Sequence, residues 1–250
     1  MTDAKQFEPA PPWRGIERSM DPRVDVFRQA FRRQEIGPRY SGMLHAMSTF
    51  GVGAAVIGFA IASLEDVQPL EWLAVPLTLL YANLAEYLGH RGPMHRPWRG
   101  LGIVYRRHAG QHHRFFTATD MEIDGSRDLK AVLFPTVMMA FFLLAFALPM
   151  GLLIGWWFGR NVAWFFVASA VAYFLNYELL HLLYHLPQSG WVGRLPWLSR
   201  LRRLHQAHHD PALMARYNFN ITYPVGDLLF GTLWRGDGRP ARAGEGRGRS

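Results

Sequence analysis

The chain has 250 residues, half of them hydrophobic, a formal net charge of +8 and no cysteine. This length suits one domain. Because cysteine is absent, disulfides, thiolate metal sites and cysteine nucleophiles are excluded, and a bound metal must take its ligands from His, Asp, Glu or backbone oxygen. The positive charge is compatible with nucleic-acid binding only if the basic residues form a suitable surface, so their positions along the chain matter.

Four long apolar stretches dominate the chain, and each is near or above the roughly 20 residues that cross a bilayer as a helix. They are Tyr40–Leu64, Leu70–Leu88, Ala131–Phe158 and Val162–Leu186. The sequence therefore predicts an all-α integral membrane protein with four transmembrane helices. The first stretch begins too late, and after too many charges, for a cleaved signal peptide. The third contains Pro135 and Pro149, so we expect it to tilt, kink or break near Met150–Gly151.

The basic residues are distributed unevenly around these stretches. In a four-span arrangement, 26 of the 27 Lys and Arg residues fall on one side, and Arg160 is the exception. The positive-inside rule makes that side cytoplasmic, with both termini there. This topology accounts for the positive net charge, so nucleic-acid binding is not needed to explain it. We expect the membrane to be a bacterial inner membrane rather than the endoplasmic reticulum. We predict a cytoplasmic segment over 1–39, a membrane-embedded domain over 40–234 and a disordered basic tail over 235–250.

Ten of the eleven histidines lie in four short groups. The groups are His90-Arg-Gly-Pro-Met-His95, His108-Ala-Gly-Gln-His112-His113, His181-Leu-Leu-Tyr-His185 and His205-Gln-Ala-His208-His209. Histidines three or four residues apart share one face of a helix, which pairs His108 with His112, His181 with His185, and His205 with His208 and His209. His90 and His95 are five apart, so we expect the helix to end at Gly92-Pro93 and a turn to bring His95 back.

All four groups fall on the predicted cytoplasmic side, where they can converge in a helical cap. Ten imidazoles exceed what one metal ion uses but suit two ions that share a site. Neutral imidazole favours iron, copper, zinc or nickel, and two irons are the natural choice for oxygen chemistry on a hydrocarbon. Zinc is a possible substitute in purified protein. His45 lies outside the groups, and we expect it to be interfacial or internally hydrogen-bonded.

The order Hx4H, Hx3HH, Hx3H, Hx2HH on a membrane chain resembles the fatty acid hydroxylase/sterol desaturase superfamily. The similarity covers His90 to Trp234 and includes Tyr217-Asn218-Phe219-Asn220 and the stretch from Asp227 to Leu233, although Asn220 stands where glycine is usual. The resemblance implies a di-iron centre that uses dioxygen and external electrons. The metal ligands that it implies are His90, His95, His108, His112, His113, His181, His185, His205, His208 and His209.

Several other polar residues are candidates for supporting such a centre. An all-imidazole site leaves a large positive charge, so we expect nearby carboxylates or bound hydroxide to balance it and to orient the ring N–H groups. The candidates are Glu86, Glu178, Asn218 and Asp227. By contrast, we expect most of Asp120, Glu122, Asp124 and Asp128 to lie on a solvated surface.

The function predicted is hydroxylation of the acyl chain of a fatty acid or membrane lipid, with electrons from a separate ferredoxin, rubredoxin or cytochrome-type donor. Desaturation, methyl oxidation and carotenoid hydroxylation within the same superfamily stay open. A b-type cytochrome is a poorer fit, because haem needs single opposed histidines rather than adjacent pairs. A metal transporter would line a path with its histidines instead of gathering them on one side. The zinc-protease motif HExxH is absent from the sequence.

Overall fold

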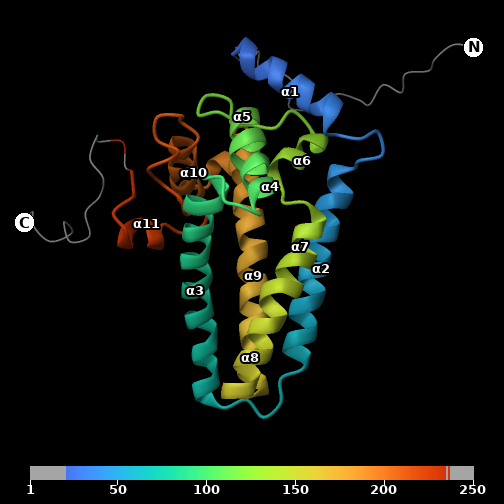
Figure 1. Cartoon of the computed structure of the whole chain (residues 1–250), viewed down its shortest axis with the longest axis vertical. Coiled ribbons are helices and arrows are strands. Elements are labelled where there is room, and N and C mark those ends of the chain that lie inside the picture. Colours follow the sequence, from blue (N-terminus) through green and yellow to red (C-terminus); the bar gives the residue numbers. More distant parts are fainter. Residues whose placement is uncertain (1–20, 235, 237–250) are drawn as a thin grey trace, which may run out of the picture.

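The computed structural model describes residues 21–234 and 236, and over these residues it consists of helices without a β-strand. The prediction of an all-α fold is confirmed. Long helical columns stand side by side, and the shorter helices gather at one end of them (Figure 1). The columns are α2 (Gly42–Ala62), α3 (Ala74–Gly89), the run from α7 (Thr136–Phe142) to α8 (Leu148–Phe158), and α9 (Arg160–His185).

Helix α9 is the central column, because α2, α3 and α8 all pack against it. Small residues permit the close approach of α8 and α9. A Cβ on Gly151 would lie 3.0 Å from Val167, and a Cβ on Gly155 would lie 3.3 Å from Ala163. Spacing small residues four apart in this way is typical of helices that pack inside a bilayer. Gly159, with a φ of 95°, ends α8 and lets the chain reverse into α9.

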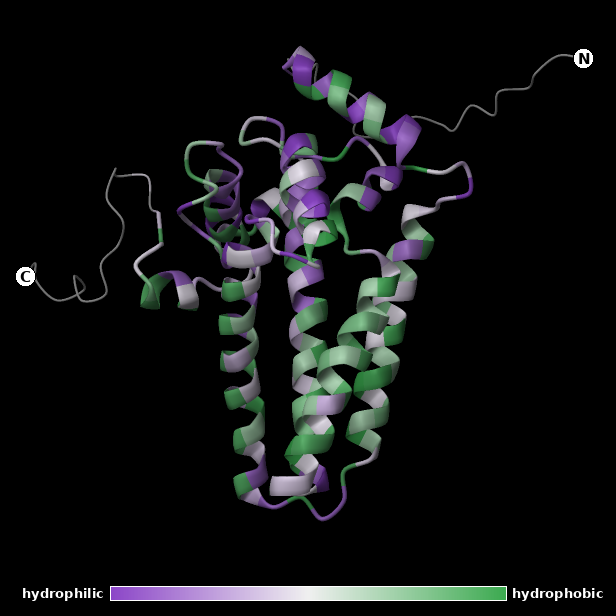
Figure 2. Cartoon of the chain, viewed as in Figure 1, coloured by the Kyte–Doolittle hydropathy of each residue, from purple (hydrophilic) through white to green (hydrophobic). Residues whose placement is uncertain are grey.

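Three helical runs are long and apolar enough to cross a membrane: Gly42–Ala62, Ser126–Phe158 and Arg160–His185. The stretch predicted as the second span does not form one α-helix of that length. It consists of a 3-10 segment, η1 (Pro69–Leu73), followed by the 16 residues of α3. Figure 2 shows hydrophobic residues along the columns and polar residues over the cap and the opposite turns. The fourth span stays a prediction.

The third apolar stretch breaks at a different place from the one predicted. The short helix α6 (Leu129–Val132) ends before Pro135, and α7 begins directly after this proline. The break expected at Met150–Gly151 is wrong, because α8 continues through both residues. Its first turn contains Pro149, and the preceding segment η5 (Leu143–Ala147) is a π-helix. The wider π turn makes room for the proline ring, which would clash with the preceding turn of an α-helix.

The cap is built from shorter elements at one end of the columns (Figure 1). Helix α1 lies over its outer side (Figure 1). The elements are α1 (Pro22–Gln34), η2 (His90–Met94), α4 (Gly102–Tyr105), η3 (Arg106–His112), α5 (His113–Phe115), η4 (Ser126–Asp128), η6 (Trp191–Arg194), α10 (Pro196–His208) and α11 (Val225–Leu229). The predicted basic tail over 235–250 lies outside the described residues except for position 236.

Candidate metal centre

The four histidine groups lie where helices leave the bundle or face it from the cap. His90 stands at the end of α3, and His185 ends α9 one turn after His181. His205 and His208 lie in the last turns of α10. Each of the ten grouped histidines is buried except His95, which is half-buried. The convergence expected from topology is therefore present.

Two of the groups lie on π-helical turns, which changes their register. A π-helix bonds residue i to i+5, so residues five apart share a face. In η3 and the residue after it, His108 faces His113, with 3.0 Å between their Nε2 atoms. The rings of His108 and His112 do stack, with centres 5.3 Å apart, but their Nε2 atoms face different histidines. The turn predicted after His90 is present: Gly92 leaves helical geometry, and the Nε2 atoms of His90 and His95 lie 3.2 Å apart.

The imidazole nitrogens form two compact clusters. In each cluster the candidate ligand atoms lie within 4.8 Å of one another. The first cluster is His90, His95, His108, His113 and His208, and the second cluster is His112, His185, His205 and His209. His181 belongs to neither set, but its Nε2 lies 3.1 Å from that of His112. His45 lies away from both and bonds to Tyr40 and to the carbonyl of Phe134.

The protonation of the rings fits metal binding. His112 and His209 use Nδ1 to donate to the carbonyls of Ala131 and Phe116, at 2.9 and 2.8 Å. Their Nε2 atoms, 3.2 Å apart, then carry lone pairs that face each other. Burial lowers the pKa of His112 and of His208 to about 4, which keeps both rings neutral at pH 7. Facing lone pairs repel unless a cation lies between them, and two nitrogens bound at about 2.1 Å to one metal lie about 3 Å apart.

A sequence profile of the family described as fatty acid hydroxylase matches residues 75–232 of the chain. The chain belongs to the fatty acid hydroxylase family. The matched segment contains all nine histidines of the clusters and His181. No curated protein matches the chain. Among solved structures, the chain is similar to one described as full-length scs7p with only the hydroxylase domain visible. The two share 18% identity with a TM-score of 0.55, over 81% of this chain and 70% of that one, which supports the fold.

In this member of the fatty acid hydroxylase family, backbone carbonyls from two loops orient the rings. In the first cluster, His90 donates to the carbonyl of Phe219, and His208 donates to that of Tyr217. In the second cluster, His185 donates to the carbonyl of Met121 at 2.6 Å. Because each Nδ1–H bond fixes both the tautomer and the ring plane, the loops over 217–222 and 115–124 set the geometry of separate clusters.

Two of the four polar candidates, Glu86 and Asp227, bond to the loop over 217–222 rather than to the imidazoles. Glu86 accepts from the backbone N–H groups of Ile221 and Thr222 and from the Tyr173 hydroxyl. Asp227 accepts from the N–H groups of Phe219 and Asn220, at 2.9 and 2.8 Å. The two carboxylates therefore hold the segment whose carbonyls orient His90 and His208.

Glu178 and Asn218 have related roles at other points. Glu178 accepts from the N–H of Phe134, just beyond the Ala131 carbonyl that orients His112. Asn218, at a φ of 55°, donates to the Leu204 carbonyl and accepts from the Trp234 N–H. It thereby ties the loop over 217–222 to α10. The expectation that these side chains would meet the ring N–H groups is wrong for the hydrogen bonds of the described residues, since carbonyls occupy that position.

The acidic loop expected on a solvated surface is largely covered. Asp120 and Asp128 are buried, and Glu122 and Asp124 are half-buried. The reason is α1, which lies across the loop and supplies Arg28 and Arg32. Arg32 bonds to Asp124 at 2.6 Å and to Asp128 at 2.7 Å. Sequence reasoning missed both arginines, because α1 carries them in a basic amphipathic pattern that is usual for an exposed helix.

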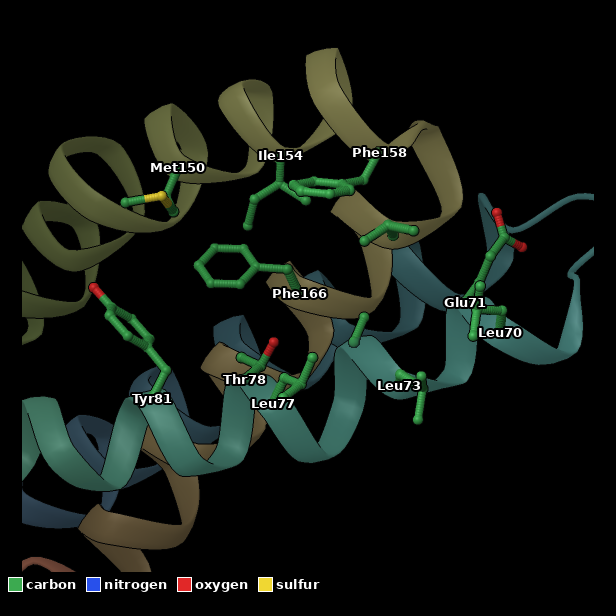
Figure 3. Close-up of a pocket in the computed structure, with 12 residues that line it drawn as sticks. Leu70, Glu71, Leu73, Leu77, Thr78, Tyr81, Met150, Ile154, Phe158 and Phe166 are labelled. Carbon is green, nitrogen blue, oxygen red and sulfur yellow. The ribbon is translucent and has the colours of Figure 1, made fainter.

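A separate apolar cavity of about 480 Å³ lies at the other end of the bundle, between α3, α8 and α9. Figure 3 shows Phe166 pointing into it, with Tyr81, Met150 and Ile154 around it. Its lining contains no histidine. The cavity has the size and lining of a hydrocarbon site, but it is separate from the two clusters.

Proposed function

We propose that this member of the fatty acid hydroxylase family is a membrane-bound di-iron monooxygenase that hydroxylates the acyl chain of a fatty acid or membrane lipid. The observation that carries the proposal is the pair of adjacent, buried imidazole clusters at the end of an apolar helical bundle. One atom of dioxygen enters the C–H bond and the other leaves as water, so the reaction takes two electrons and two protons. A separate ferredoxin, rubredoxin or cytochrome-type protein is the proposed electron donor.

The proposed ligands are the nine histidines of the two clusters and His181. Their nitrogen-only chemistry suits iron and also zinc, which can replace iron in purified protein. When bound, iron supplies the electrons and open coordination that dioxygen activation requires. The chain excludes water by burying the imidazoles, keeps them neutral, and fixes their planes through the carbonyls of the two loops. This rigidity is what selective oxidation of one carbon needs.

The proposed topology has four spans, with the cap and both termini in the cytoplasm of a bacterial cell. The segment over residues 69–89 supports the fourth span, since η1 and α3 together supply 21 consecutive helical residues. The basic residues support the orientation. The catalytic domain proposed is 40–234, with cytoplasmic segments on either side.

Lipid mass spectrometry of cells with and without the gene tests this function. Hydroxylation predicts a lipid that is 16 Da heavier than its precursor only in cells that express the wild-type chain. Cells that express His112→Ala or His208→Ala should lack this species. A product 2 Da lighter would instead indicate desaturation, and an unchanged lipid profile would contradict both reactions.

A further inference from the structure

Arg28 of α1 is a fully buried arginine whose hydrogen-bond partners are backbone carbonyls. Its side chain is 0% exposed. It donates to the carbonyl oxygens of Phe115, Asp120 and Glu122, at 2.7, 2.6 and 3.1 Å. Burying a guanidinium costs free energy that such bonds must offset. An arginine in this position therefore holds the loop over 115–124 in one conformation.

The three carbonyls that Arg28 binds are next in sequence to the two that orient histidines. Phe115 precedes Phe116, whose carbonyl accepts from His209 at 2.8 Å. Asp120 and Glu122 flank Met121, whose carbonyl accepts from His185 at 2.6 Å. Arg28 therefore fixes the backbone on both sides of the contacts that orient two members of the second cluster.

The guanidinium is also enclosed by aromatic rings and by one carboxylate. Its central carbon lies 4.9 Å from the ring centre of Phe115 and 5.3 Å from that of Phe116. The carboxylate of Asp124 lies 3.6 Å from Nη1. These contacts restrict the guanidinium to one orientation, which matters because its planar fork must meet three carbonyls together.

The first cluster has a different support, formed by Glu86 and Asp227 on the loop over 217–222. No hydrogen bond of Arg28 among the described residues reaches that loop. We propose that Arg28 is a positioning residue for the second cluster alone, so that α1, although remote in sequence from the histidines, selectively tunes the affinity of one of two metal ions. This inference rests on the proposed two-metal function.

Iron binding by the full-length chain in lipid nanodiscs tests the inference. Metal is removed with a chelator, and Fe²⁺ is titrated back without oxygen by equilibrium dialysis. His95→Ala disables the first cluster and leaves the second to be measured, and His205→Ala does the reverse. Arg28→Met should weaken Fe²⁺ binding by about 10-fold in the His95→Ala background and leave it unchanged in the His205→Ala background.

Two further variants separate positioning from general stability. Arg28→Lys keeps the charge but cannot span three carbonyls, so it should weaken Fe²⁺ binding by the second cluster as well. If circular dichroism shows that Arg28→Met does not fold, Arg28→Lys replaces it. Arg32→Met is the matched control, because it removes the ion pairs of the same helix to Asp124 and Asp128. It should leave iron affinity unchanged in both backgrounds.

Equal weakening in both backgrounds, or none in the His95→Ala background, would overturn the role of Arg28. Equal effects of Arg32→Met and Arg28→Met would also overturn it, because they would reduce α1 to a general anchor. A wild-type chain that binds no iron would contradict the proposed function and this inference together. A wild-type chain with two irons and an unaffected Arg28→Met variant would contradict the inference alone.

Discussion

His112 and His113 are neighbours in the sequence, yet their Nε2 atoms belong to different clusters. The Nε2 atom of His113 lies 3.0 Å from that of His108, whereas the Nε2 atom of His112 lies 3.2 Å from that of His209. Successive residues of a helix project in different directions, so a helix that passes between two sites can serve both. The end of η3 and the residue after it therefore supply one ligand to each of the two proposed metal sites.

Metal removal should lower the thermal stability of the protein. Without metal, the clusters leave unprotonated nitrogens facing one another in a buried space, and a ligand that binds only the folded state stabilises it by about 4 kcal/mol at 1,000 times its Kd. We expect a chelator to lower the unfolding midpoint in detergent and Fe²⁺ to restore it. The double variant His112→Ala/His113→Ala should show no chelator effect. Identical midpoints for the metal-loaded and chelated wild type would argue against a structural metal contribution.

Asp227→Asn should destabilise the chain and weaken the first cluster. The carboxylate accepts from two backbone N–H groups and from the Thr232 hydroxyl, and an amide cannot accept all three with the same geometry. A buried donor left without a partner costs about 1–3 kcal/mol. We expect that loss in the free energy of unfolding, together with weaker binding of one iron. The control is Glu65→Gln, at the exposed turn at the other end of the bundle, which should change neither.

The absence of cysteine makes the topology directly testable. Single variants Asp66→Cys and Asn161→Cys should react with a membrane-impermeant maleimide in intact cells, because four spans place both turns outside. Arg96→Cys and Arg203→Cys should react only after permeabilisation. If α3 does not cross the membrane, Asp66→Cys will instead be labelled under the same conditions as Arg96→Cys.

The sequence was sufficient to predict the helical class and the convergence of the histidines. Spacing and the position of basic residues carry that information, because both follow from helix geometry and membrane topology. The division of the histidines into two clusters was not predictable. It depends on the π-helical turns of η2 and η3, and nothing in their sequences distinguishes a π-helical turn from an α-helical one. The position of the helix break was not predictable either. The helix breaks at Pro135 and not at Met150–Gly151, because the turn that precedes each proline determines whether the helix can continue through it.

The supports of the site were predictable only in part. Glu86 and Glu178 stood out because carboxylates inside apolar spans need partners, and Asp227 because a positive metal site needs nearby carboxylates. The backbone N–H groups that Glu86 and Glu178 accept from are far along the chain, 135 positions away for Ile221 and 44 for Phe134, whereas those that Asp227 accepts from are seven and eight positions away. Arg28 gave no sequence signal at all, because its role depends on a loop 87 or more positions away.

The most direct test of the account is the iron content of the chain and of the variants His112→Ala and His113→Ala, each purified with matched iron supply. We predict about two irons for the wild type, about one for each single variant with different spectroscopic signatures, and none for the double variant; His45→Ala should retain two. If both single variants lost the same iron, with identical spectra, or if both kept two, the two-cluster assignment would be wrong.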